Sequence, residues 1–212
     1  EKLDEVIRAF AKVFDGREID TAKLLKALKA HLELMRSGGA AMCLVAKDFE
    51  YNVLKVATLY KKSPKECKTL ASMLELERES GIHDGNILHE ASAAMGLLWI
   101  RRSLAFQLEL YASLIPSDGD EPKAAAYDAY QNTLSPYHGW MLRTAFSASL
   151  SQLPDRPVFM SKFAEVDIEE LDHEHEYKLK KKLRALIGTL EPLLSVWKDN
   201  FDEMNMEDTR RV

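Results

Sequence analysis

The chain has 212 residues, 46% of them hydrophobic and 30% charged, with a formal net charge of −5. This length allows a sizeable core in one large domain or two small ones. Acidic and basic residues are interspersed, which argues against a general binder of nucleic acid or of anionic membranes, and no apolar run approaches the ~20 residues that span a bilayer.

Helical periodicity dominates the start of the chain. Apolar residues three and four apart predict a first helix from Leu3 to Phe14, ended by Gly16. A second helix should be capped by Asp20 or Thr21. Its inner face is predicted to hold Leu24, Leu28, Leu32 and Met35.

The stretch from 38 to 56 places three polar residues on one side of a predicted helix, after a Gly38-Gly39 break. Asp48, Asn52 and Lys55 follow one another at steps of four and three, so their side chains form one stripe. Since nine small or apolar residues precede the stripe, it could grip a polar group at the mouth of an apolar space. The alternative is an ordinary amphipathic helix whose ladder of side chains faces water.

Turn signals divide the next part of the chain. Ser63-Pro64-Lys65-Glu66 combines a capping box with a proline at the first helical position, which predicts a fourth helix from there to about Ser80. A loop at 81–85 should precede a long apolar helix at about 87–115, and 116–120 reads as a surface loop.

The last third also reads as helices. The predicted pieces are about Pro122–Leu134, a helix that follows the turn 135–140 and ends at Pro154, and a short piece near Val158–Phe163. A last long helix should be capped by Asp167, and Gly188 and Pro192 should bend or break it. Without strand alternation, internal repeats or a linker, the sequence predicts one all-α domain of about eight helices over 1–212.

Enzyme signatures are missing from the sequence, which has no glycine-rich phosphate loop, CxxC pair, GxSxG or HExxH. The acidic and histidine cluster at 172–176 contains His173 and His175. Two residues apart on a helix, they point about 160° away from each other, whereas ligands on one helix face need spacings of three or four. We therefore expect solvated helix surface there, with no metal, no cofactor and no enzymatic activity.

Three aromatic residues have both a structural and a functional interpretation. Trp99, on the long apolar helix, can be a core residue or a flat platform for a sugar ring. His138, in the turn after Pro136-Tyr137, can be structural or functional. Trp140 can be core or an anchor at a membrane interface, because an indole favours a boundary that is wet on one side.

Ordered motifs carry a family resemblance. They are Asp48-x3-Asn52-x2-Lys55, WIRRSLAF from Trp99, AYDAYQNTLSPYHGW from Ala126, and the ending FSASLSQLP. In this order and at these separations, they resemble the glycolipid transfer protein family over about residues 20 to 165. The resemblance implies an all-α, two-layer helical sandwich enclosing a hydrophobic lipid pocket, and a non-enzymatic carrier of one sphingolipid.

The resemblance also implies roles for individual residues. It assigns headgroup contacts to Asp48, Asn52 and Lys55, and a place under the first sugar to Trp99. His138 would hold the ceramide amide together with Asp48. The hydrocarbon pocket would be lined by Val45, Phe106, Phe146 and Leu150, and the membrane would be touched by Trp140.

One branch of the family carries ceramide-1-phosphate, with Lys in place of Asn52, Arg in place of Trp99 and another Arg at the position of Met95. This sequence matches the sugar-binding branch instead. It departs from that branch at Tyr51, where a Gly is usual and where the larger side chain could narrow the headgroup site. Its C-terminus, MNMEDTRRV, lacks a Tyr found near the end of well-known members, which leaves open whether it contacts the site.

The expected protein is a cytoplasmic, monomeric carrier that picks up a glycosphingolipid during a transient contact with a membrane surface and does not bind nucleic acid. Cys43 and Cys67 lie in helical patterns without a disulfide framework, as in reduced intracellular proteins. Two alternatives stay open. One is a carrier or sensor of ceramide-1-phosphate, and the other is a helical interaction module that has kept the fold and lost the cargo.

Overall fold

The computed structural model describes residues 1–37, 42–116 and 121–212, and all regular elements in these ranges are helical. They are α1 (Lys2–Phe10), α2 (Thr21–Ser37), α3 (Cys43–Lys62), α4 (Leu70–Glu79), α5 (Ala93–Leu114), α6 (Pro122–Thr133), the 3₁₀ helix η2 (Ser135–Tyr137), α7 (Trp140–Leu150), α8 (Arg156–Ala164), the 3₁₀ helix η3 (Ile168–Glu170) and α9 (His173–Glu203). The all-α prediction is confirmed, with nine α-helices in the described ranges where about eight were expected. The predicted break at 38–39 and most of the predicted loop at 116–120 lie outside them.

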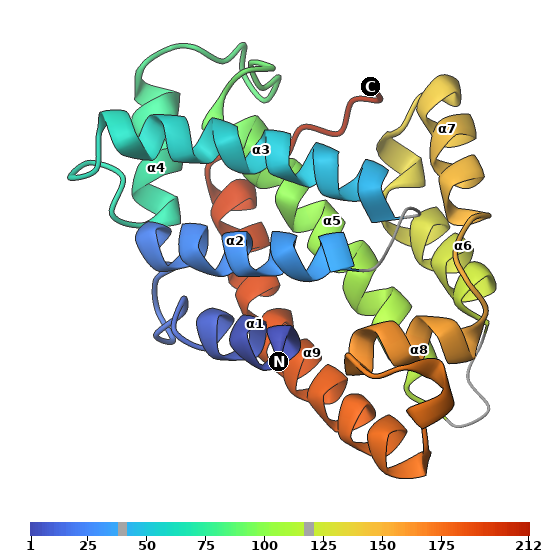
Figure 1. The fold of residues 1–212 in the computed structure, drawn as a ribbon. Coiled ribbons are helices and arrows are strands. Elements are labelled where there is room, and N and C mark those ends of the chain that lie inside the picture. Colours follow the sequence, from blue (N-terminus) through green and yellow to red (C-terminus); the bar gives the residue numbers. More distant parts are fainter. Residues whose placement is uncertain (38–41, 117–120) are drawn as a thin grey trace.

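The helices form two layers. Helices α1, α2 and α3 lie side by side and cross over α5 and α9, while α6, α7 and α8 complete the other end of the molecule (Figure 1). One continuous apolar core joins all nine helices, and its largest fully buried side chains include Trp197, Tyr111 and Tyr130. None of the helices in the described ranges is long and apolar enough to cross a membrane.

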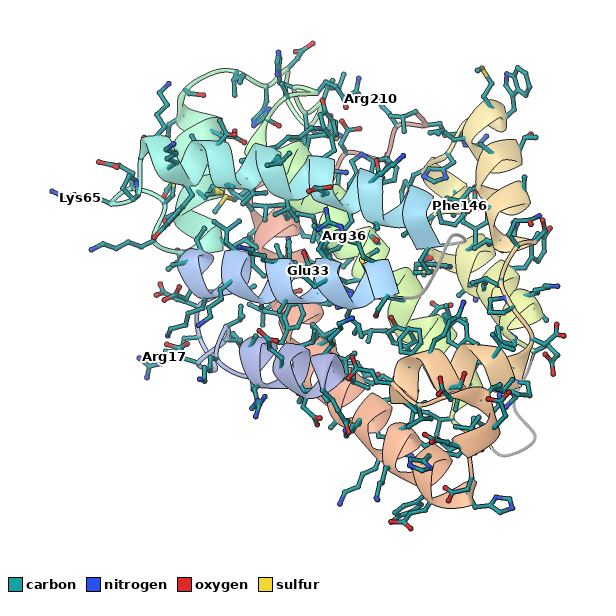
Figure 2. All side chains as sticks on the ribbon, in the orientation of Figure 1. Arg17, Glu33, Arg36, Lys65, Phe146 and Arg210 are labelled. Carbon is teal, nitrogen blue, oxygen red and sulfur yellow. The ribbon has the colours of Figure 1, made fainter. Side chains whose placement is uncertain are left out.

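Helices α2 and α3 are also linked by charge. The guanidinium of Arg36 on α2 lies 2.8 Å from a carboxylate oxygen of Glu50 on α3 and 2.8 Å from one of Glu33 on its own helix (Figure 2). All three side chains are largely open to solvent, so the pairs add little stability. The inner face of α2, by contrast, buries the four apolar residues predicted for it.

The predicted start of the fourth helix at Ser63 is wrong. Ser63 ends α3, and residues 64–67 form a turn. The helix begins instead after Thr69, whose hydroxyl accepts the Ser72 N–H in a capping box. Tertiary hydrogen bonds explain the later start, because residues 68–70 exchange backbone hydrogen bonds with Ile19 and Thr21 and are held extended until Leu70.

The long apolar helix also starts later than predicted, at Ala93 instead of near Ile87. Ser92 caps it by accepting the N–H of Met95 at 3.0 Å. The buried carboxylate of Glu77 accepts the next free N–H groups, those of Ala93 at 2.8 Å and Ala94 at 2.7 Å. A carboxylate at this position also complements the positive end of the helix dipole.

Two further boundaries differ from the prediction. Helix α1 ends at Phe10, before the predicted Phe14, which pairs with Ile19 across the turn at Gly16. Asp167 precedes only the short η3 and its side chain makes no capping hydrogen bond there, whereas Asp172 caps α9 by accepting the His175 N–H at 2.9 Å.

Helix α9 then runs unbroken for 31 residues through Gly188 and Pro192, so the predicted break does not occur. Its buried apolar face, which includes Leu186, Leu190 and Trp197, is held against the core. Tertiary packing of this face therefore outweighs the single hydrogen bond that the proline removes.

Gly96 lies where α5 crosses α3. A Cβ built on Gly96 would lie 2.6 Å from the carbonyl oxygen of Asn52 and 3.2 Å from the Cβ of Lys55. Because these atoms belong to a helix backbone and its first side-chain carbon, they cannot swing aside. A glycine at 96 therefore permits the close approach that puts Trp99, about one turn later, on the same pocket as Asn52 and Lys55.

We predict that Gly96→Ala lowers the free energy of unfolding by about 1–3 kcal/mol, since the added methyl must push α5 away from α3. Gly188→Ala is the matched control, because Gly188 lies inside α9 with open space around it. In this control the free energy of unfolding should rise by about 0.5–1 kcal/mol, because alanine has a higher helix propensity than glycine. Urea unfolding of both variants measures the difference, and equal stabilisation by both would show that the crossing has room for a side chain.

Candidate functional site

A pocket of about 320 Å³ opens between α3, α5 and the segment that leads into α7. Its walls bring together all five residues predicted for the headgroup site: Asp48, Asn52, Lys55, Trp99 and His138. These residues come from three distant parts of the chain. The alternative in which the α3 stripe is a plain water-facing ladder does not hold for Asn52, of which only 3% is exposed.

Asn52 is the buried member of the stripe. Its side-chain Nδ2 donates to the Asp48 backbone oxygen at 2.9 Å and to the Asp48 carboxylate at 3.2 Å. Its Oδ1 is buried and has no hydrogen-bond partner within the described parts of the chain. A buried acceptor without a donor lowers stability by about 1–3 kcal/mol, and a ligand that supplies a hydroxyl or N–H would relieve this.

Lys55 is held from two sides. Its Nζ lies 3.4 Å from a carboxylate oxygen of Glu90, in the loop before α5, and 4.6 Å from the centre of the Tyr51 ring. Only 7% of the Lys55 side chain is exposed, against 70% for Glu90. Tyr51, which stands where a glycine is usual in the sugar-binding branch, lines the pocket. The cation–π contact between its ring and Lys55 helps to hold the Lys55 ammonium in place.

Asp48 stays open to solvent at the pocket mouth. Protein on either side partly desolvates its carboxylate and raises its pKa, while the Lys55 ammonium and the Asn52 amide oppose this shift. Glu90, a second carboxylate, raises the pKa further. Asp48 thus presents an acceptor whose charge is only partly compensated by its neighbours.

Trp99 and His138 form the opposite wall. Their ring centres are 5.4 Å apart, with 31° between the ring planes, and only 9% and 8% of these residues are exposed. Both the core and the functional interpretation of Trp99 fit in part, because the residue is largely buried and still lines the pocket. An indole face at a pocket wall offers a flat apolar surface on which a sugar ring can stack.

The turn that carries His138 is held by the first turn of α7. The guanidinium Nε of Arg143 donates to the carbonyls of Ser135 at 3.1 Å and His138 at 2.9 Å. The ring Nδ1 of His138 is 3.0 Å from the Tyr130 hydroxyl. His138 lines the pocket, and no hydrogen-bond partner is found for its Nε2 among the described residues.

His138 is neutral at pH 7. Desolvation, together with the smaller effect of the nearby cations Arg143 and Arg102, lowers its pKa to about 4. A neutral imidazole carries one N–H and one acceptor nitrogen. When the Tyr130 hydroxyl donates to Nδ1, the proton lies on Nε2, which then can donate to a carbonyl oxygen.

The residues predicted for the hydrocarbon pocket divide into two groups. Val45 and Phe146 line the pocket (Phe146 is labelled in Figure 2). Phe106 and Leu150 are buried in the core and are not part of the pocket wall. Phe106 packs edge-on against Phe146, with ring centres 5.7 Å apart, so it lies directly behind the pocket.

Trp140 is not a core residue, because 77% of it is exposed at the start of α7. The next two residues are also exposed apolar side chains, Met141 at 67% and Leu142 at 43%. Leu142 reaches the pocket wall as well. The core interpretation of Trp140 is therefore excluded, and an apolar tip adjoins the pocket.

The C-terminus does contact the site, a point that the sequence left open. Val212 lines the pocket, its N–H donates to the Tyr137 carbonyl at 3.0 Å and its backbone oxygen accepts the Gly139 N–H at 2.6 Å. Arg102 holds the preceding residues through Glu207 and the Asp208 carbonyl, and its guanidinium stacks 3.5 Å from the centre of the Tyr137 ring.

Sequence reasoning missed six residues that line the pocket: Glu90, Ser103, Leu134, Leu142, Ala145 and Val212. Ser103 could have been found, since it lies one turn after Trp99 on the same helix face. Glu90 and Val212 carry no local signal, because only the tertiary fold brings a loop and the C-terminus to the pocket. At the 172–176 cluster, His175 Nδ1 lies 2.8 Å from its cap Asp172, and no group of ligands for a metal is found within the described ranges.

A helical sandwich with a polar stripe at the mouth of an apolar-walled pocket defines a carrier of amphipathic molecules such as lipids. Comparison with known families agrees with this class. The chain belongs to the glycolipid transfer protein family, since the family model described as Glycolipid transfer protein (GLTP) matches residues 19–165.

Relatives of known name are similar over most of the chain. Glycolipid transfer protein 1 of Arabidopsis thaliana is 36% identical over 147 residues, which cover 69% of this chain and 70% of that protein. The structure of apo mouse ceramide-1-phosphate transfer protein has a TM-score of 0.84 at 20% identity and covers 98% of each chain. HET-C2, a fungal glycolipid transfer protein, has a TM-score of 0.81 at 23% identity over 98% of this chain and 100% of that one. These two structures have names from different headgroup classes, so the headgroup must be argued from this chain's own residues.

We predict that His138→Asn makes stability less sensitive to acid. In the wild type, a folded-state pKa near 4 against 6.5 in the unfolded chain means that unfolding takes up a proton between these values. The free energy of unfolding therefore falls with decreasing pH, by roughly 2 kcal/mol from this group between pH 7 and 5. Urea unfolding at both pH values should show a drop smaller by that amount in the variant.

His31 contributes a second acid-dependent term to the free energy of unfolding in this experiment. It is fully buried with a pKa also near 4, so a comparable acid dependence persists in both proteins. An identical drop in wild type and His138→Asn would mean that His138 titrates normally in the folded protein.

Proposed function

We propose that this protein binds one sphingolipid with a neutral sugar headgroup and transfers it between membranes. The observation that carries the proposal is the pairing of a buried, unsatisfied Asn52 oxygen with the solvent-open Asp48 carboxylate at the pocket mouth. Sugar hydroxyls both donate and accept, so they can satisfy the Asn52 oxygen and the Asp48 carboxylate while accepting from Lys55. Trp99 supplies the apolar face for the first sugar ring.

The sphingolipid amide has one N–H and one carbonyl oxygen. In the proposed complex, the amide N–H donates to Asp48 and the carbonyl accepts from the Nε2–H of His138. The Tyr130 hydroxyl, 3.0 Å from Nδ1, would fix this tautomer. Asp48 would thus serve both the amide and the sugar, and His138 the amide alone.

The hydrocarbon chains require a closed apolar space. Exposing about thirty methylenes to water costs on the order of 20 kcal/mol at ~0.8 kcal/mol for each, so a carrier must cover them. Val45 and Phe146 form the entrance, and Phe106 and Leu150 lie in the core behind it. Because the chains move from one apolar medium to another, their transfer is nearly neutral, and selection falls on headgroup bonds of about 0.5–3 kcal/mol each.

Three positions support the sugar headgroup over ceramide-1-phosphate. The phosphate-binding pattern has Lys, Arg and Arg where this chain has Asn52, Trp99 and Met95. Met95 is buried in the core, with 2% exposure, and provides no charge. The structural similarity to a ceramide-1-phosphate transfer protein makes that lipid the second candidate cargo, to be compared in the same experiment.

We predict that the wild-type protein moves galactosylceramide between vesicles and that Asp48→Val slows this at least tenfold. The reason is the loss of a charged acceptor for the amide and the sugar, which is worth about 1.5–3 kcal/mol. Asp199→Val, at an exposed position of α9, is the matched control and should transfer at the wild-type rate. Fluorescent galactosylceramide and ceramide-1-phosphate should be assayed in parallel.

Faster transfer of ceramide-1-phosphate than of galactosylceramide would make the protein a phosphosphingolipid carrier. If neither lipid moved and neither raised the melting temperature, the interaction-module alternative would replace the carrier. Equal galactosylceramide transfer by wild type and Asp48→Val would contradict the proposed headgroup site.

The exposed tip of Trp140, Met141 and Leu142 is proposed to make the transient membrane contact, since it adjoins the pocket. We predict that Trp140→Ala lowers binding to phosphatidylcholine vesicles and slows transfer several-fold, while lipid binding within the pocket is retained. Tyr177→Ala, which removes another exposed aromatic residue on α9, is the control. Vesicle sedimentation measures the membrane contact, and equal sedimentation of Trp140→Ala and wild type would place the contact elsewhere.

A further inference from the structure

We propose that Glu90 is a specificity-determining residue that excludes sphingolipids with anionic headgroups from the pocket. This inference rests on the proposed carrier function and adds to it the reason for a neutral headgroup. Glu90 lies in the loop before α5, outside every motif of the sequence, and lines the pocket beside the Lys55 ammonium, which Tyr51 also contacts.

The charges that line the pocket sum to a negative value. Asp48 and Glu90 are acidic and Lys55 is basic, which gives −1 from the lining residues because His138 is neutral at pH 7. A phosphate monoester carries about −1.5 to −2 at this pH. It would meet two carboxylates at the mouth, with like-charge repulsion, whereas a sugar carries no charge and avoids this repulsion.

Among the described residues that line the pocket, Lys55 is the single cation, and it is already paired. Lys55 has its ammonium 3.4 Å from Glu90 and over the Tyr51 ring, and the ammonium would have to leave Glu90 to pair with a phosphate. The Glu90 side chain is 70% exposed, so this ion pair contributes little to folding. Its effect is therefore expected in selection among ligands, with little change in stability.

Other cations near the pocket are engaged as well. Arg102 binds Glu207 and the Asp208 carbonyl behind Trp99, and Arg143 binds two backbone carbonyls. Arg210, which is labelled in Figure 2, is held by the Asp208 carboxylate at 2.7 Å. This pairing is the main reason that the pKa of Arg210 is raised, and the nearby Glu90 carboxylate adds to the rise. Since each of these guanidinium groups already has an acceptor, none offsets the negative mouth without giving up a bond.

The test compares wild type, Glu90→Gln and Glu75→Gln in vesicle transfer of galactosylceramide and ceramide-1-phosphate. Glu90→Gln keeps the shape of the side chain, removes its charge and frees Lys55. Glu75→Gln changes the net charge equally at an exposed ion pair on α4, which is not part of the pocket. We expect the ratio of ceramide-1-phosphate to galactosylceramide transfer to rise three- to tenfold in Glu90→Gln and to stay at the wild-type value in Glu75→Gln.

Salt provides a second readout that a structural role of Glu90 would not produce. The increase in the ratio of ceramide-1-phosphate to galactosylceramide transfer should be smaller at 0.5 M salt than at 0.05 M salt. The pocket mouth is open to solvent, so salt screens its charges, over about 14 Å at 0.05 M and about 4 Å at 0.5 M. An unchanged ratio in Glu90→Gln, together with normal galactosylceramide transfer, would overturn the role of Glu90 and leave the carrier function intact. Absence of galactosylceramide transfer by the wild type would overturn the carrier function itself, and the role of Glu90 with it.

Discussion

The close contact of α5 with α3 at Gly96 is the constraint on which the site depends. Without a side chain at 96, the α5 backbone can approach the Asn52 carbonyl, and the polar stripe of α3 then shares a pocket with Trp99. Glu77 and Ser92 fix the start of helix α5 through hydrogen bonds to its first N–H groups. These bonds, together with the contact at Gly96, set the position of α5 along and about its axis. The site is therefore built on two rigid helices, and the turn carrying His138 completes it.

The site combines an apolar wall with polar groups that are incompletely paired. Folding normally pairs buried donors and acceptors, yet the buried Asn52 oxygen has no partner among the described residues. Four cations near the pocket, Lys55, Arg102, Arg143 and Arg210, are in contrast each bound to an acceptor. The pocket therefore offers polar groups that can still form hydrogen bonds, while its positive charges are already paired and its net charge is negative. These properties suit a neutral headgroup with several hydroxyls better than a phosphate.

Local signals located the helices well and their ends less well. The capping box at 63–66 satisfies the rules for a helix start, but the hydrogen bonds of residues 68–70 to Ile19 and Thr21 hold that segment extended. Asp167 likewise is a residue type that can cap a helix, but it precedes only the three-residue η3 without a capping hydrogen bond, and the long helix begins after Asp172. Pro192 removes one hydrogen bond, which the packed face of α9 outweighs. Tertiary contacts thus override the local signal at residues 68–70 and at Pro192, whereas the start of α9 follows another local cap, Asp172.

The sequence by itself determined the helical class and the α3 stripe, because helix periodicity fixes which side chains share a face. That Trp99 and His138 would join the stripe was implied only by the resemblance of the ordered motifs to the glycolipid transfer protein family. Only the tertiary structure decided that Trp140 is exposed, that Glu90 holds Lys55, and that Val212 closes one side of the pocket. These facts depend on where a loop and a chain end come to lie, and no periodic pattern in the sequence encodes that position.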